Sequence, residues 1–265
     1  MMTKIRNGLM RSTPYAKRGT RRLYAAFRLI TLGMLLSQLY LQRWEGVGIL
    51  LLTFALYALP WAIVRFLKIE IPNLFEGFII CFIFSAMNLG EMRNFYNTFP
   101  LWDTALHTLN GFLAAGVGLS LVELLNHNAK RVRLSPVFIA ILTFSFSMTI
   151  GVLWEFGEYT ADNVLGLDMQ KDRIVHTINS VALSADDSRV QLPEIDRTVI
   201  SYQARDGQTA TKSINGYLDI GLHDTMKDLF VNLVGAVCFA VFAYFYELSN
   251  AERFQFIQHF VPKRK

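Results

Sequence analysis

Charged residues are scarce in this sequence. Lys, Arg, Asp and Glu make up only 18% of its 265 residues, whereas 52% are hydrophobic and the mean hydropathy is +0.31. A soluble protein needs more charged surface to stay dispersed, while a membrane protein presents apolar side chains to lipid and confines its charge to loops. The composition therefore excludes an ordinary soluble fold and favours an integral membrane protein.

Cysteine is scarcer still, with Cys81 and Cys238 the only two. Both lie inside apolar segments and neither belongs to a CxxC pair, which excludes a disulfide framework and a cysteine-based zinc site. The sequence also lacks an internal repeat, a low-complexity tract and a small-x-small cleavage motif after the apolar run around Met34 to Leu41. We therefore expect the first apolar segment to be retained as a signal anchor.

Long apolar runs, by contrast, are abundant. A helix needs about 20 residues to cross a hydrocarbon core of about 30 Å. Six stretches reach this length, at 23–42, 46–67, 72–92, 100–125, 135–158 and 222–248. The prediction is an all-α polytopic membrane protein with a six-helix transmembrane bundle. Its first span is the weakest because Arg28 lies within it.

The basic residues predict the orientation of this bundle. With six spans, both tails and two of the loops fall on one side of the membrane, and all four are basic. Their basic residues include Lys17, Arg18, Arg21, Arg22, Arg65, Lys68, Lys130, Arg131, Arg133, Lys263, Arg264 and Lys265. The positive-inside rule makes that side the cytoplasm, so both termini are predicted to be cytoplasmic. Because the basic runs adjoin apolar segments, we expect them to contact the lipid bilayer and anionic headgroups rather than nucleic acid.

This topology divides the chain into five parts. They are a basic cytoplasmic tail (1–22), helices 1 to 5 (23–159), an extracytoplasmic loop (160–221), helix 6 (222–248) and a cytoplasmic C-terminal tail (249–265). Within the loop, residues 198–203 and 209–214 are β-rich, alternate in polarity and flank an Asp-Gly turn. The loop is therefore predicted to contain a small β-hairpin, inserted between helices 5 and 6.

Polar side chains recur at helical spacing in the last three spans. Such spacing keeps the polar groups of each span on one helical face. The predicted topology brings all three sets to the extracytoplasmic end of the bundle, where ionised groups at membrane depth usually mark function. The residues are Asp103, His107 and Asn110 in span 4, Glu155, Glu158 and Asp162 in span 5, and His223, Asp224, Asp228 and Asn232 in span 6.

The chemistry of these side chains favours a divalent cation. So many carboxylates, with Lys227 the only Lys or Arg inside the last three spans, would repel one another unless a cation neutralised them. Carboxylate, imidazole and amide ligands suit Mg, Mn, Zn or Fe better than a thiophilic metal. We expect Asp103, His107, Glu155, Asp224 and Asp228 as metal ligands, Glu158 or His223 as a catalytic base, and Asn110, Asp162 and Asn232 as further polar groups of the site.

Other interpretations of the same residues stay open. Partly protonated carboxylates could serve a cation or proton-coupled transporter, although the sequence shows no matched pair of interrupted helices. Residues near the membrane surface could instead tether the loop, with Asp224 capping span 6. In span 3, Glu76 is interpreted as interfacial and Asn88 as an interhelical hydrogen-bonding residue.

Three blocks of sequence carry a resemblance to a known family. They are WDTALHTLNG (102–111), WEFGEYTADNVLG (154–166) and GYLDIGLHDTMKDLFVNLVGA (216–236). In these blocks the chain resembles the YjdF-like family of bacterial membrane-spanning proteins, whose activity is not established. Asp228, Asn232, Gly235 and Ala236 are also distantly similar to VanZ-like proteins. The resemblance implies a multi-pass protein of the bacterial cytoplasmic membrane and supplies no reaction.

Three functions are consistent with the sequence. The first is a metal-dependent enzyme acting at the outer face of the membrane on a lipid-linked or envelope substrate. The second is the cation or proton-coupled transporter. The third is a structural or signalling membrane protein whose hairpin binds a protein partner that the sequence does not identify.

Overall fold

The computed structural model describes residues 16–67, 69–127, 134–184, 186, 188–204, 206–249, 252, 254–260 and 263–264. Within these residues lie six helices long and apolar enough to cross a membrane. The predicted six spans and helical class are therefore confirmed. The chain forms two compact units, unit 1 (Met1–Leu153 and Asp228–Lys265) and unit 2 (Trp154–Lys227). The predicted basic residues Lys130, Arg131 and Arg133 lie outside the described residues.

In unit 1, the first two spans form an antiparallel helix pair. Helix α2 (Arg18–Tyr40) is followed after a short turn by α3 (Trp44–Leu67). Gln42 adopts the left-handed conformation in that turn, with φ of 54°. Helix α2 begins earlier than the predicted position 23, because arginine is a good helix former and its charged side chains lie at the exposed start of the helix.

The third span contains a change of helix type. Helix α4 (Asn73–Ile83) continues directly into a π-helix, η1 (Phe84–Glu91). The sequence did not predict this feature, which is rare and frequently found at functional sites. Asn88 in η1 is fully buried and accepts a hydrogen bond from Thr31 of α2 at 3.0 Å, as expected of an interhelical residue. Glu76, expected near the membrane surface, is also fully buried.

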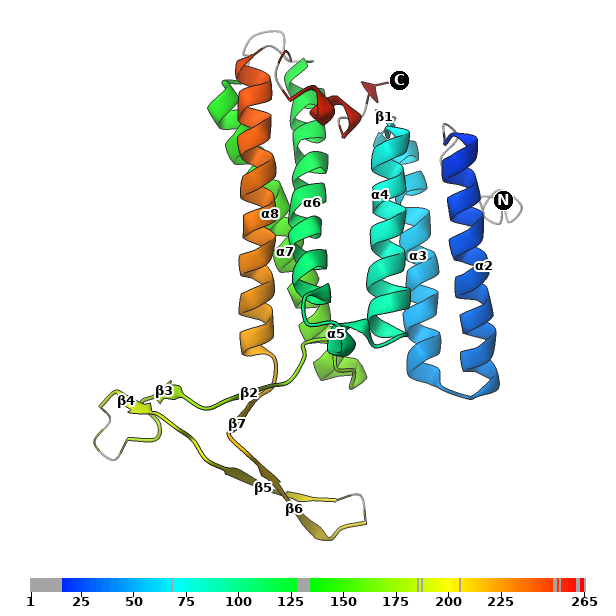
Figure 1. The fold of residues 1–265 in the computed structure, drawn as a ribbon. Coiled ribbons are helices and arrows are strands. Elements are labelled where there is room, and N and C mark those ends of the chain that lie inside the picture. The colour runs from blue at the N-terminus through cyan, green and yellow to red at the C-terminus, as the bar shows by residue number, and fades with distance from the viewer. Residues whose placement is uncertain are drawn as a thin grey trace. The chain divides into compact units, whose positions relative to one another are not determined.

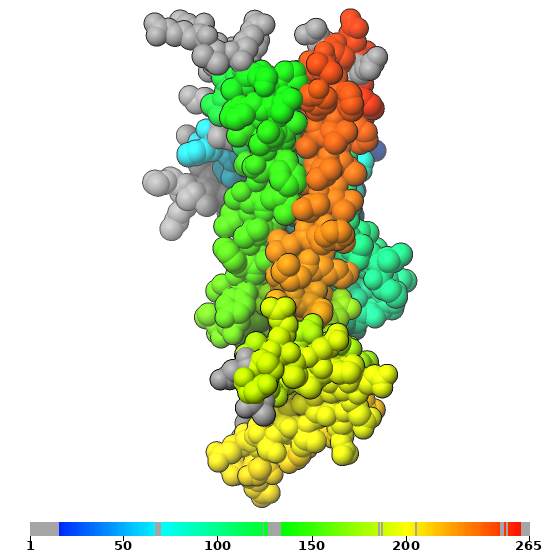
Figure 2. Space-filling model, turned by 90° about the vertical axis from the view of Figure 1, so that its left-hand side faces the viewer, coloured from blue at the N-terminus to red at the C-terminus, as the bar shows by residue number. Residues whose placement is uncertain are grey.

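The remaining helices follow a short connecting helix, α5 (Phe95–Thr98). They are α6 (Trp102–His127), α7 (Pro136–Leu165) and α8 (Leu222–Leu248), of which α7 and α8 each begin or end in unit 2. In unit 1, α2, α3 and α4 form one group of helices and α6, α7 and α8 another (Figure 1). Figure 2 shows α7 in green beside α8 in orange along one face.

The core of unit 1 is closed by the segment after α8. The 3₁₀-helix η2 (Gln255–His259) leads to Phe260, whose ring lies 5.4 Å from that of Phe75 and 6.1 Å from that of Phe239. The Ser120 hydroxyl donates to the Phe260 carbonyl at 3.2 Å. Strand β8 (Lys263–Arg264) then pairs with β1 (Ile69–Glu70). This segment therefore folds back onto the helices of unit 1.

Unit 2 contains the predicted hairpin. Strand β5 (Thr198–Gln203) pairs with β6 (Thr209–Ile214) in antiparallel register, which confirms the hairpin between the fifth and sixth spans. Gly207 supplies a positive φ of 79° in the turn. Two further antiparallel pairs were not predicted, because strands of three residues are too short to show alternation. They are β2 (Arg173–Val175) with β7 (Tyr217–Asp219), and β3 (Ile178–Ser180) with β4 (Val190–Leu192).

Candidate metal site

Two candidate ligands, Asp103 and His107, lie one turn apart at the start of α6. Trp102 supports this turn, since its ring packs edge-on against Phe95 of α5 at 5.0 Å. The i, i+4 spacing places both polar side chains on one face of the helix. The Nε2 atom of His107 lies 3.4 Å from Oδ1 of Asp103. The ring and the carboxylate therefore meet as the sequence spacing implied.

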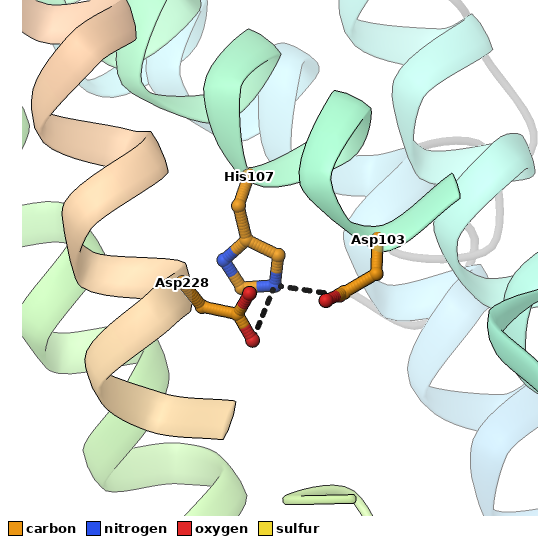
Figure 3. Close-up of side chains that lie close together, drawn as sticks. All are labelled: Asp103, His107 and Asp228. Atoms are coloured by element: carbon orange, nitrogen blue, oxygen red, sulfur yellow. Dashed lines mark ion pairs between the residues drawn. The ribbon is translucent and has the colours of Figure 1, made fainter. Parts of the chain in front are cut away.

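Asp228 of α8 reaches the same imidazole nitrogen. Its Oδ2 atom lies 3.8 Å from His107 Nε2, and Figure 3 shows both carboxylates directed toward that nitrogen. Asp228 is 1% exposed and His107 is 9% exposed. One ligand atom from each of the three residues lies within 4.8 Å of the others. We refer to Asp103, His107 and Asp228 as the carboxylate–histidine cluster.

Two glycines allow α6 and α8 to approach this closely. A Cβ atom added at Gly111 of α6 would lie 2.0 Å from the backbone oxygen of Asn232, and one added at Gly235 of α8 would lie 2.0 Å from that of Thr108. Only glycine fits backbone contacts of this kind, which are typical of tightly packed membrane helices. The crossing therefore sets the distance between the helices that carry His107 and Asp228.

A hydrogen-bonded layer lies next to the cluster along the bundle. Asn110 donates to Asn232 at 3.0 Å, joining α6 to α8. The buried Ser147 of α7 donates to the carbonyl of Gly111 at 2.6 Å. Gly151 of α7 also faces the Asn232 amide, which a Cβ atom there would approach to 2.6 Å. These contacts fix three helices at this level, and the role of Ser147 had no signal in the sequence beyond a polar residue in an apolar span.

The geometry of the cluster fits a divalent cation. Two ligand atoms that each lie about 2.1 Å from a tetrahedral zinc ion stand about 3.4 Å apart, close to the 3.4 and 3.8 Å separations around His107. Two carboxylates and one imidazole meet in a largely buried place, where ionisable side chains usually mark function. The donor set, two oxygens and one nitrogen, suits Mg, Mn, Zn or Fe.

A comparison with known families identifies the chain. Residues 21–249 match the family described as "Predicted membrane protein (DUF2238)". The chain belongs to the DUF2238 family. This match confirms the membrane-protein family indicated by the three sequence blocks, whereas the distant similarity to VanZ-like proteins is not shown. No curated protein and no solved structure gives a match.

Two further candidates of this DUF2238 chain lie on α7 within unit 2. Glu155 and Glu158 are both buried, at 4% and 8% exposure. The indole nitrogen of Trp154 donates to Glu158 Oε1 at 2.8 Å, one turn along the same helix. This bond orients the Glu158 carboxylate. The assignment of Glu155 as a ligand and Glu158 as a base stays a prediction.

Asp224 has strong partners of its own in unit 2. Its carboxylate accepts hydrogen bonds from the Lys171 backbone nitrogen at 2.8 Å and from Arg173 Nη2 at 2.8 Å. These bonds join the first turn of α8 to the start of β2, and Asp224 is 3% exposed. A carboxylate at a helix N-terminus is also favourably placed in the helix dipole. The contacts thus match the capping and tethering interpretation that the sequence left open.

Asp162 and His223 lie at the helix ends in unit 2, in the last turn of α7 and the first turn of α8. Asp162 accepts hydrogen bonds from the backbone nitrogens of Met169 at 2.6 Å and Gln170 at 2.8 Å, which close the loop after α7. His223 is exposed, and its backbone nitrogen donates to Asp219 at 2.8 Å. Both residues therefore make contacts that stabilise the fold.

The carboxylates of this loop influence one another electrostatically. Partial desolvation raises the pKa of Asp172, and the nearby charges of Asp168, Asp219 and Asp162 raise it further. Asp172, Asp168 and Asp219 of this loop therefore lie close enough to Asp162, in the last turn of α7, for their charges to interact.

Proposed function

We propose that this chain is a divalent-metal-dependent membrane enzyme that acts at the outer face of the bacterial cytoplasmic membrane on a lipid-linked or envelope substrate. The observation that carries the proposal is the meeting of Asp103 and His107 with Asp228, which come from helices far apart in the sequence. A chain that only needed apolar helix packing would not bury two carboxylates around one imidazole.

The orientation follows from the basic residues at the start of the bundle. Lys17, Arg18, Arg21 and Arg22 lie at the beginning of α2 and indicate a cytoplasmic start. With alternating spans, α6 then begins at the opposite side, where Asp103 and His107 stand in its first turns. The cluster is thereby assigned to the outer face, and Lys263 and Arg264 to the cytoplasmic side.

The proposed chemistry is hydrolysis of a phosphate ester. A divalent cation held by the cluster would polarise a phosphoryl oxygen and favour deprotonation of water. Asp103, His107 and Asp228 would hold the cation, and a general base would accept the proton of the attacking water. The water oxygen forms a bond to phosphorus, the ester bond between phosphorus and the lipid or sugar oxygen breaks, and the leaving oxygen receives a proton.

The first test is metal binding by the purified protein. Titration calorimetry with MnCl₂, ZnCl₂ and MgCl₂ should give one site per chain for at least one of the three ions. Asp228→Asn keeps the size of the side chain but removes a charge, and should weaken binding about tenfold or more, since supporting or ligating groups commonly contribute that much. Asp186→Asn, which changes an exposed loop carboxylate, is the matched control and should bind like wild type.

The second test is activity. Wild-type protein in vesicles of bacterial envelope lipids should release water-soluble phosphate or phosphorylated headgroup in the presence of the bound ion, and Asp228→Asn should not. Metal binding without any product, combined with cation flux across the vesicle membrane, would favour the transporter instead. A folded wild type that binds none of the three ions contradicts the proposal.

A further inference from the structure

A second polar feature lies in the other helix group of unit 1, around Arg28. This residue stands five positions after Leu23, where the apolar run of α2 begins, which is about 7.5 Å along the helix and therefore inside a hydrocarbon core of about 30 Å. A guanidinium at this depth costs several kcal/mol unless it is paired or hydrated. Arg28 therefore needs partners.

The contacts of Arg28 fix its depth but satisfy few of its donors. The guanidinium lies over the ring of Tyr24 at 4.8 Å, and Nη2 donates to the Tyr57 carbonyl of α3 at 3.4 Å. Tyr24 lies one turn before Arg28 on α2. A guanidinium held over its ring therefore stays inside the span and does not extend to the first turn of the helix. Its Nε atom is buried and makes no hydrogen bond. Five donor hydrogens thus share one long bond to a carbonyl.

Neighbouring polar groups are committed to other partners. The Asn88 amide donates to the Tyr57 hydroxyl at 3.4 Å, and its oxygen accepts a hydrogen bond from Thr31. Among the described residues, Arg28 takes part in no ion pair, whereas His107 and Arg173 do. The groups that still lack a hydrogen-bond acceptor are N–H donors of the positively charged Arg28 guanidinium. Such donors are suited to binding an anion.

The position of Arg28 leaves it accessible. Arg28 itself is only half-buried, and the next two residues, Leu29 and Ile30, are 71% and 48% exposed on the surface that a membrane would cover. A guanidinium with free N–H groups in a fixed planar arrangement suits the paired oxygens of phosphate or carboxylate.

We propose that Arg28 is the centre of an oxyanion-binding site between α2 and α3, with a phosphate group as its ligand. The site is separate from the carboxylate–histidine cluster, which attracts cations, and does not depend on the enzyme proposal. The phosphate can belong to an acidic phospholipid entering from the bilayer or to a soluble phosphate compound. Tyr24 holds the guanidinium in place through its ring and is a positioning residue.

The test measures ligand-dependent stability of the full chain in neutral detergent. One arm adds sodium phosphate against sodium chloride of equal ionic strength, and the other adds phosphatidylglycerol against phosphatidylcholine. Wild type should show a saturable rise in melting temperature in at least one arm. Native mass spectrometry should show retained phosphatidylglycerol if the lipid arm is the positive one. A rise with sodium phosphate assigns a soluble ligand, and a rise with phosphatidylglycerol alone assigns a lipid.

Two variants and one control test the residue. Arg28→Gln should weaken the apparent affinity about tenfold or more, as expected for loss of a charge-assisted hydrogen bond. Arg28→Lys keeps the charge without the planar donors and should fall between Gln and wild type, which also covers the case that Arg28→Gln does not fold. Arg65→Gln alters an arginine that lies over Trp61 elsewhere on α3 and should match wild type. No shift in either arm for wild type, or equal shifts for wild type and a folded Arg28 variant, would overturn the site.

Discussion

The imidazole of His107 on α6 lies 3.8 Å from the carboxylate of Asp228 on α8. This contact depends on two features that lie close by in both helices. Gly111 and Gly235 let the backbones touch, and the hydrogen bond between Asn110 and Asn232 fixes their rotation. The small residues next to the cluster are therefore as necessary for the site as its ligands.

Enlarging either glycine at the helix crossing should destabilise the protein. In Gly111→Ala and Gly235→Ala, the new methyl group would lie 2.0 Å from a backbone oxygen, so α6 and α8 must separate. Overpacking of this kind costs about 1–3 kcal/mol, and more where backbone must move. Thermal unfolding in detergent measures the loss, and the same samples should bind metal more weakly.

Gly33→Ala on α2 provides the control for this prediction. A Cβ atom there meets nothing within 4 Å. Alanine is also the better helix former, so the variant should be as stable as wild type or more stable by up to about 1 kcal/mol. Equal melting temperatures for Gly33→Ala and Gly111→Ala would show that the close crossing does not exist.

Substitution of Asp224 can show whether this residue tethers the loop or binds the metal. Because its carboxylate is bonded to Lys171 and Arg173, Asp224→Asn should loosen the segment between α7 and β2 and speed its cleavage by protease. Metal affinity should stay within about twofold of wild type, since the Asp224 carboxylate bonds to Lys171 and Arg173 and not to the metal-binding residues. Arg173→Gln removes the other partner and should produce the same cleavage. A large loss of metal binding in Asp224→Asn but not in Arg173→Gln would make Asp224 a ligand.

The loop at Asp186 should respond to acid. Its carboxylate accepts hydrogen bonds from the hydroxyls of Ser184 and Ser188, which lower its pKa from 3.8 to about 2. Because the folded pKa lies below the unfolded value, these bonds stabilise the loop above pH 3.8 and are lost as the pH falls toward 2. Carboxyl NMR titration of the double variant Ser184→Ala and Ser188→Ala should show the pKa rising toward 3.8. In Ser180→Ala it should stay near 2; a pKa that does not respond to the double substitution contradicts these hydrogen bonds.

The membrane topology could be predicted because its signals are local. Apolar length identifies a span without knowledge of its neighbours, and alternation around Asp-Gly identifies β5 and β6 with their full bounds. The extension of α7 to Leu165 could not be seen this way, because Thr160, Asp162 and Asn163 interrupt the apolar run while the helix continues. The π-helix of Phe84–Glu91 also has no hydropathy signature.

The site could be predicted only in part, for a related reason. The pairing of Asp103 with His107 follows from spacing within one helix, whereas the addition of Asp228 depends on how α6 packs against α8. Spacing alone gives Asp224 and Asp228 equal standing, since they lie one turn apart on the same helix. Their contacts distinguish them, because Asp224 bonds to Arg173 and Asp228 faces His107. For Arg28, the sequence indicated only that a charged residue makes the first span less apolar than the others.

The most direct test of the metal site is whether the nitrogen of His107 binds the ion. Purified protein loaded with Mn²⁺ can be examined by pulsed electron paramagnetic resonance, which detects a coordinated imidazole nitrogen. We expect a signal from one histidine nitrogen that is lost in His107→Gln and kept in His176→Gln, which changes an exposed histidine of unit 2. A folded wild type that holds no Mn²⁺ and equally no Zn²⁺ or Mg²⁺, or a nitrogen signal that survives in His107→Gln, would contradict it.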